Sequence, residues 1–277
     1  MHYFSFVTLL QNQNLLLMAL YHCTLTLHDN VFFATREMGI LYETEKYLHN
    51  WGLSFALFTI NYIPQPYRLQ GELAQKPTYL DATAEQNLLH LNQAGIYIFP
   101  AQPISWSYQI NTFKAAQVGY YGKSKQFGDK GAEKNYPINY GRAKELAVGS
   151  QYRTYIIAPE TIKIPRWIRL GKWASKIRVE AIKIPEQVIQ NKSGDYTCLH
   201  PLNPLDLPSH TRILLYNRIV MPPVSLVSQA QLRGEYLTTK KDDWQDFKST
   251  LSHQQLPEEI HLPTGVFYGA GNVVATA

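Results

Sequence analysis

The stretch Tyr21–His28, YHCTLTLH, decides how the fold begins. Apolar residues occupy every second position of this stretch, and polar residues fill the positions between them. A period of two is typical of a β-strand with one buried face. We therefore predict that a strand opens the domain, with its buried face formed by Tyr21, Cys23, Leu25 and Leu27.

Further strands and two helices are predicted outward from this stretch. Strand patterns occur at 96–99, 104–110, 151–158, 177–184 and 213–220. Region 36–58 places apolar residues on one helical face, which predicts a long amphipathic helix. A capping box of Thr83 and Gln86, with Gly95 as a stop signal, predicts a short helix over 84–94. Together these elements indicate a mixed α+β fold.

The composition is that of one globular domain. The chain has 277 residues, of which 45% are apolar, and this is enough for a substantial core. We predict a single domain over 18–277, with residues 1–17 as an N-terminal extension outside the fold. Apolar runs are too short for a membrane-spanning helix. Two cysteines are too few for a disulfide framework, which favours a reducing, cytoplasmic location.

Positive charge is concentrated in the segment Pro165–Val179, PRWIRLGKWASKIRV. Its cations repel one another unless an anion neutralises them, and two tryptophans between them offer flat stacking surfaces. Single-stranded nucleic acid is held by this combination of phosphate contacts and stacked rings. A solvated basic face is the alternative. Because Ile168 and Leu170 already supply apolar anchoring, we expect one of Trp167 and Trp173 to face the ligand and the other the core. The predicted binding residues here are Arg166, Trp167, Arg169, Lys172, Trp173 and Lys176.

A second mixture of basic and aromatic residues lies in the glycine-rich region of about 114–150. Little hydrophobic period is present there, which predicts a long, flexible insertion. A disordered, solvated loop is the plainer interpretation, but the recurrence of the same mixture in two segments favours one shared groove. The predicted binding residues in this region are Lys114, Tyr120, Tyr121, Lys123, Lys125, Arg142 and Lys144.

No local motif in the sequence indicates a cofactor, a metal site or a catalytic centre. The pairs Cys198 with His200 and Ser209 with His210 are adjacent in sequence, but such chemistry requires a spatial arrangement that adjacency does not provide. A metal-independent ribonuclease needs no local motif, so it remains the alternative function, with His28 or His49 as the candidate base or acid.

Three long strings together resemble a known family. They are LTLHDNVFFATREMGILYETEKYLHN, NYPINYGRAKELAVGS and PRWIRLGKWASKIRV. They are similar to the small RAMP-type, Cas-five-like subunit of type I-D CRISPR Cascade complexes. The resemblance runs from about Met18 to the end of the basic segment and more loosely beyond it.

The resemblance implies a ferredoxin-like or RRM-related RAMP core with a thumb, which corresponds to the glycine-rich insertion. The implied task is to cap the five-prime handle of the CRISPR RNA (crRNA) without catalysis, although some relatives cut the precursor RNA. The implied partners are the backbone RAMP subunit, the Cas-ten-like large subunit and target double-stranded DNA near the PAM. An isolated RNA-binding protein outside any complex is a weaker alternative.

Overall fold

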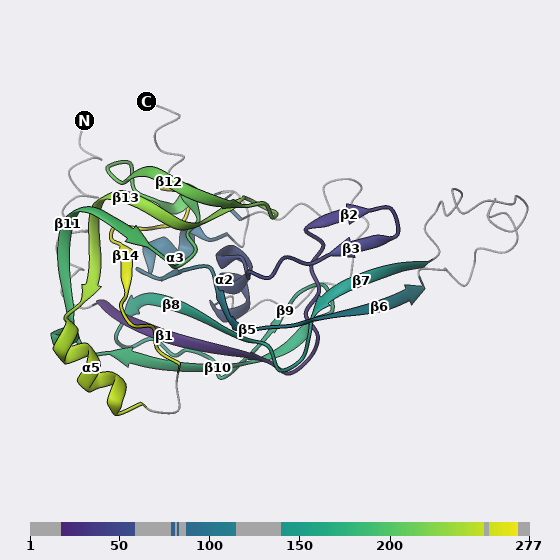
Figure 1. The fold of residues 1–277 in the computed structure, drawn as a ribbon, viewed down its shortest axis with the longest axis horizontal. Helices are drawn as coiled ribbons and strands as arrows, with labels where there is room; N and C mark the ends of the chain where they lie inside the picture. Colours follow the sequence, from purple (N-terminus) through teal and green to yellow (C-terminus); the bar gives the residue numbers. More distant parts are fainter. Residues whose placement is uncertain are drawn as a thin grey trace, which may run out of the picture.

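The structure is a computed structural model that describes residues 18–58, 79–80, 82, 87–114, 140–251 and 255–270. Its largest sheet has six strands in the order β4-β8-β1-β10-β9, with β5 also pairing with β8, and the pairs within it are antiparallel (Figure 1). The strands are β1 (Met18–Leu27), β4 (Tyr97–Ile98), β5 (Gln102–Ser105), β8 (Gln151–Pro159), β9 (Trp167–Leu170) and β10 (Ser175–Ile184).

Two four-stranded sheets, three α-helices and two short 3-10 helices, η4 (Glu186–Val188) and η5 (Pro204–Asp206), complete the described elements. One sheet has the order β11-β13-β12, with β14 on β13; its strands are β11 (Ile189–Cys198), β12 (Arg212–Ile219), β13 (Leu226–Thr239) and β14 (His261–Pro263). The other has the order β2-β3-β7-β6, with strands β2 (Arg36–Met38), β3 (Leu41–Glu43), β6 (Tyr108–Lys114) and β7 (Tyr140–Leu146). We call this sheet the arm, because Figure 1 shows β6 and β7 extending away from the rest of the described chain. The helices are α2 (Asn50–Phe58), α3 (Leu89–Gln93) and α5 (Lys241–Ser249).

The central strand β1 fixes the two faces of the six-stranded sheet. Its odd-numbered residues, such as Cys23 and Leu25, are fully buried and join a cluster that includes Leu53 and Leu57 of α2. The face that carries the even-numbered residues of β1 is buried at one end, where Leu20 belongs to a second cluster shared with β11 and β13. Toward the opposite end of that face, Thr24 and Thr26 are partly exposed. Within the described residues, this part of the sheet is therefore partly open to solvent.

A buried carboxylate anchors helix α2 to the rest of the core. Asp206 accepts hydrogen bonds from Asn50 Nδ2 at 2.7 Å, Trp51 Nε1 at 3.1 Å, Tyr97 OH at 3.2 Å and the Gly269 backbone N–H at 3.0 Å. Burial disfavours the charged form and raises the pKa of Asp206 to about 6. The donors come from α2, β4 and the C-terminal segment, so this one residue joins three parts of the chain.

The structure confirms the mixed α+β class and most of the predicted strands. The predicted strands at 151–158, 177–184 and 213–220 correspond to β8, β10 and β12, and the strand at 96–99 corresponds to the shorter β4. The prediction of one strand over 104–110 is wrong, because β5 ends at Ser105 and β6 begins at Tyr108. The predicted helix over 84–94 corresponds to α3, which is shorter, while Thr83 and Gln86 lie outside the described residues.

The predicted long helix over 36–58 is wrong for most of its length. Residues 36–43 form the β2–β3 hairpin, whose turn contains Gly39 at a φ of +62°. Strand β3 then pairs in parallel with β7, which lies about a hundred residues later in the sequence. Only 50–58 is helical, because the apolar residues before it are used by the arm and by connecting segments.

The prediction of an irregular insertion over about 114–150 is wrong for residues 140–146. Strands β6 and β7 flank residues 115–139, and they pair in an antiparallel register from Tyr108 with Leu146 to Lys114 with Tyr140. Residues 140–146 therefore form regular structure rather than a flexible loop. The connection at 115–139 and the N-terminal extension at 1–17 lie outside the described residues.

Candidate nucleic-acid interface

The β9–β10 hairpin forms one edge of the six-stranded sheet, and its two faces differ sharply. Ile168 pairs with Ile177 in the ladder, and both side chains are buried, at 4% and 0% exposure. Successive side chains of a strand point to opposite faces. The side chains on either side of these isoleucines therefore point to the opposite face of the sheet, which is the face that carries the even-numbered residues of β1. We define the hairpin face as the exposed side chains Trp167, Arg169, Lys176 and Arg178, together with the adjacent His28.

Trp167 is the centre of the hairpin face. Its side chain is 44% exposed, so an aromatic surface remains open to solvent. Lys176 Nζ lies 4.2 Å from the ring centroid, and the His28 ring packs edge-on with centroids 4.9 Å apart. A cation over an indole face is an attractive contact, and it holds the ring in place without burying it. The ring and the ammonium group are thus positioned together.

Within the part of the chain that the structure describes, the two arginines of the hairpin face pair with acidic side chains that are themselves exposed. Arg178 pairs with Glu180 at 2.8 Å, and Arg169 lies 3.8 Å from Asp29. Exposed ion pairs contribute about 0–1 kcal/mol each. A phosphate can replace such a partner at little cost, so these groups remain available to bind a polyanion.

The same face continues across two more strands, β1 and β8, where its side chains are partly exposed, and sequence patterns did not identify this part. In one row, Arg178 pairs with Thr26 of β1, which in turn pairs with Gln151 of β8. In the next row, Glu180 of β10 pairs with Thr24, which in turn pairs with Arg153. These residues are far apart in sequence, and only the order of the strands brings them together. Their hydroxyl, amide and guanidinium groups extend the polar surface beyond the hairpin.

The hairpin turn depends on a glycine. Gly171 has a φ of +78°, and a Cβ there would lie 2.7 Å from the backbone oxygen of Phe32. The Lys172 backbone N–H donates to that same oxygen at 2.8 Å. Trp173 follows in the turn and packs against the Phe32 ring, with centroids 4.9 Å apart. The turn is therefore held closely against the loop that follows β1.

The expectation that one tryptophan faces the core is wrong. Trp167 and Trp173 are 44% and 48% exposed, so both present ring surface to solvent. Trp173 contacts Phe32 at the turn, whereas Trp167 lies among the cations of the ladder. Of the other predicted residues in this segment, Arg166 and Lys172 are exposed and flank the hairpin face.

The predicted residues of the insertion do not all lie at the hairpin face. Arg142 is exposed on β7, and Lys144 on the same strand pairs with Glu43 at 3.2 Å and lies 4.3 Å from the Tyr108 ring centroid. Both belong to the arm rather than to the six-stranded sheet. Lys114 ends β6, and its side chain is outside the described part, as are the other predicted residues of this region, Tyr120, Tyr121, Lys123 and Lys125.

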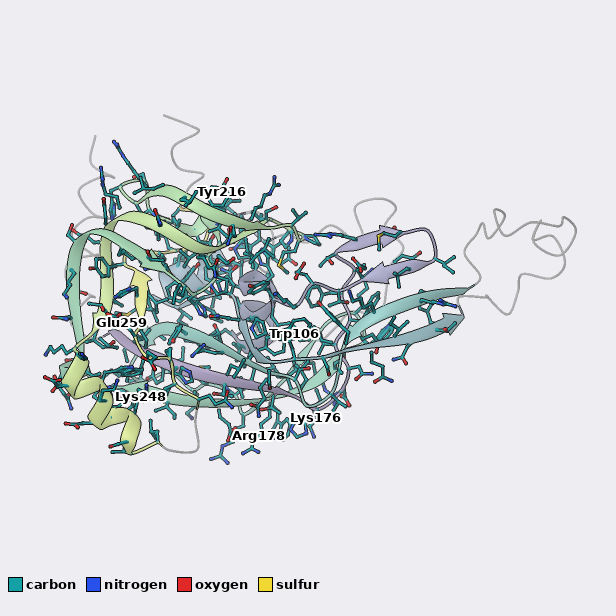
Figure 2. The ribbon with its side chains drawn as sticks, viewed as in Figure 1. Trp106, Lys176, Arg178, Tyr216, Lys248 and Glu259 are labelled. Carbon is teal, nitrogen blue, oxygen red and sulfur yellow. The ribbon has the colours of Figure 1, made fainter. Side chains whose placement is uncertain are left out.

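The sequence patterns also missed an aromatic and basic cluster near the arm. Trp106 is 43% exposed, and its ring packs against that of Tyr108 with centroids 5.1 Å apart. Lys46 Nζ lies 5.4 Å from the Trp106 ring centroid. This cluster resembles the arrangement at Trp167, but Figure 2 shows Trp106 apart from Lys176 and Arg178.

The buried histidines and cysteines serve the core. Burial lowers the pKa of His49 to about 4, and its Nε2 is bonded to the Val224 carbonyl at 3.1 Å. Burial likewise lowers the pKa of His200 to about 3, and its Nε2 contacts the Pro100 carbonyl at 2.8 Å. Cys198 donates to the backbone oxygen of His200 at 3.4 Å, and burial raises its pKa to about 12. A neutral thiol bonded to a backbone oxygen is not a nucleophile paired with a base.

No group of three or more metal-ligating side chains occurs among the residues that the structure describes. The helices within the same residues are too short or too polar to span a membrane.

Comparisons with known proteins identify a family and a structural neighbour. The family model described as type I-D CRISPR-associated protein Cas5/Csc1 matches residues 18–271. Among solved structures, the chain is similar to one of the type III-B Cmr-beta complex, determined by cryo-EM with cognate target RNA and AMPPnP bound. That likeness has 7% identity and a TM-score of 0.43, and it covers 86% of this chain and 90% of the other. No curated protein matches the sequence.

Proposed function

The chain belongs to the type I-D CRISPR-associated Cas5/Csc1 family, and from this premise we propose that it is a non-catalytic RNA-binding subunit that caps the five-prime handle of crRNA. In this role it also positions the backbone RAMP subunit and the Cas-ten-like large subunit, near the PAM of target double-stranded DNA. The family assignment itself confirms the resemblance seen in the sequence. The finer role is supported by the surface described above.

The observation that carries the proposal is the hairpin face. Trp167 offers an open indole surface, and Lys176 holds a positive charge 4.2 Å from the centre of that ring. A base stacked on the indole would place its phosphate within reach of Arg169 or Arg178, which are exposed on the same face. Stacking contributes about 1–3 kcal/mol per base, and each phosphate contact adds salt dependence.

The same face of the sheet continues beyond the hairpin and gives the RNA a path across β1 and β8. Thr26 and Gln151 continue the row of Arg178, and Thr24 and Arg153 form the next row. Hydroxyl, amide and guanidinium groups can hydrogen-bond to base edges and to the 2′-hydroxyl, which distinguishes RNA from DNA. Binding is therefore expected to be partly base-specific at nucleotides whose bases are splayed apart.

The arm supplies a second wall for the handle in this proposal. Arg142 and Lys144 lie on β7, which with β6 frames the glycine-rich insertion. Lys114, Tyr120, Tyr121, Lys123 and Lys125 are proposed to contact the guide RNA as part of that insertion. Their role stays a prediction.

The ribonuclease alternative now depends on one histidine. His49 is buried and bonded to a backbone carbonyl, which removes one of its two candidate residues. His28 is exposed and lies against Trp167 on the hairpin face, where a bound backbone would pass. General acid–base catalysis requires such proximity. Incubating repeat RNA with the purified protein in EDTA distinguishes the two functions: a discrete cut that His28→Ala abolishes would support the enzyme.

The direct test of the capping role changes charge without changing the fold. The double variant Arg169→Ala and Lys176→Ala removes two exposed side chains of the hairpin face. We expect weaker binding of a five-prime-handle oligonucleotide and loss of handle protection in the assembled complex, with an unchanged melting temperature. A matched double variant, Lys241→Ala and Lys248→Ala, removes the same charge from helix α5. Equal loss of binding in both variants would show that net charge, rather than the hairpin face, holds the RNA.

A further inference from the structure

Strand β12 displays large apolar side chains to solvent. Leu214, Leu215 and Tyr216 are consecutive, and they are 49%, 62% and 49% exposed. Val220, just beyond the strand, is 47% exposed. In Figure 1, β12 is the outermost strand of its sheet, and its one ladder partner among the described residues is β13. Contiguous apolar side chains on a surface mark an interaction site more often than single ones do.

Irregular pairing explains why three neighbours are exposed together. The register of β12 with β13 shifts between Ile213 and Leu215, so Leu214 has no opposite residue. A second shift follows between Leu215 and Asn217. In a regular strand, alternate side chains would turn inward, but bulges interrupt that alternation. Bulges also discourage regular addition of another strand at an edge. A partner at this edge would therefore contact the side chains of β12 rather than pair with its backbone.

The sequence segment that carries these side chains has positive charges and no acidic residue. The segment from His210 to Gln231 contains no Asp or Glu, and its two cations are Arg212 and Arg218. Both side chains are exposed, and Arg218 Nε donates to the Ser225 hydroxyl at 3.2 Å. Neither arginine forms an ion pair within the residues described. An apolar strip between two arginines is complementary to an apolar surface rimmed by carboxylates.

We propose that β12 is a protein-docking surface, and that its occupant is another subunit of the effector complex presenting an apolar surface with an acidic rim. This inference rests on the proposed function, because it takes the chain to work within that complex. The exposed leucines offer an apolar surface with no group that binds phosphates or base edges, and tyrosine and arginine are enriched among the residues that contribute most to binding energy in protein interfaces. Figure 2 shows Tyr216 at the top of the molecule and Lys176 and Arg178 near the bottom, so the docking surface and the hairpin face are separate.

The test uses the complete complex, reconstituted from this chain, the other type I-D effector subunits and crRNA. Leu215→Glu places a negative charge opposite the expected acidic rim. We expect it to lower the affinity of the chain for the other subunits at least tenfold, measured by titration of the tagged chain. The charge reversal Arg212→Glu with Arg218→Glu is expected to do the same. Leu199→Glu is the matched control, because Leu199 is 65% exposed but follows β11, on the other side of β13.

Two further readouts separate this proposal from the capping role. Melting temperature and handle-RNA affinity of each isolated variant are expected to equal those of the wild type. If the chain fails to bind RNA but still needs Leu215 for assembly, the capping role fails and the docking surface stands. Assembly of Leu215→Glu with wild-type affinity would overturn the proposal. A loss of RNA affinity in Leu215→Glu would also overturn it, because β12 would then bind RNA. The same holds if the wild-type chain is a homodimer that Leu215→Glu converts to a monomer, because β12 would then bind a second copy of the chain.

Discussion

Replacing Trp167 by alanine tests the stacking part of the proposed interface most sharply. The ring is 44% exposed and is held by Lys176 at 4.2 Å, so removing it deletes the stacking surface and leaves the sheet beneath it unchanged. Stacking of one base on an aromatic side chain contributes about 1–3 kcal/mol. At about 1.4 kcal/mol per tenfold, the expected loss of affinity is roughly 5-fold to 150-fold.

The assay is fluorescence anisotropy with a labelled oligonucleotide of the crRNA five-prime handle, at fixed salt. Tyr216→Ala is the control, because Tyr216 is 49% exposed but lies on β12, apart from the hairpin face. Trp167→Phe keeps an aromatic face and is expected to retain most of the affinity. The reasoning is refuted if Trp167→Ala binds like the wild type, or if Tyr216→Ala loses as much affinity.

Three other predictions follow from named contacts. Lys176→Ala is expected to reduce the slope of log affinity against log salt by about 0.7 if the lysine contacts one phosphate of a single strand; an unchanged slope in a salt titration would exclude that contact. Gly171→Ala is expected to lower stability by at least about 1–2 kcal/mol, because the glycine has a φ of +78° and its Cβ would meet a backbone oxygen at 2.7 Å; a wild-type urea midpoint would contradict this. Acidification from pH 7 to pH 5 is expected to destabilise the protein. Burial lowers the pKa of His49 to about 4 and that of His200 to about 3. Below about pH 6.5 the unfolded chain therefore binds protons that the folded chain does not bind, and each histidine lowers the free energy of unfolding by about 2 kcal/mol at pH 5. Asp206, with its pKa raised to about 6, opposes this by about 1 kcal/mol. Urea denaturation at the two pH values measures the difference, and equal or greater stability at pH 5 would show that the two histidines are not held neutral.

Local patterns predicted β1, β4, β8 and β10 of the six-stranded sheet but missed β5 and β9. A buried face imposes a period of two on a long strand, whereas β5 and β9 have four residues each. Buried positions alternate with more exposed ones over 23–27 of β1 and over 175–179 of β10. The arm was not predicted, because β2 and β3 have three residues each and depend on pairing with β7. Such short strands carry no period, and their pairing is non-local, so the apolar spacing of 36–58 gave a false indication of a helix.

The candidate site was predicted in part. Basic and aromatic residue types identified Trp167, Arg169 and Lys176, which the ladder places on one face. Thr26 and Arg153 were missed, since each lies in a strand of ordinary composition and joins the surface only through the order of strands in the sheet. Sequence patterns could not predict whether the side chains of Trp167 and Trp173 face solvent or the core, because this depends on the strand register and on the turn at Gly171.

The measurement that tests the central claim most directly is photo-crosslinking of crRNA within the reconstituted type I-D complex, with photoreactive nucleotides placed along the five-prime handle. Mass spectrometry then identifies the crosslinked peptides of this chain. We predict crosslinks from the handle to peptides of β9 and β10, which contain Trp167 and Lys176. Crosslinks that are confined to β12, or a handle that reacts with other subunits and not with this chain, would contradict the account.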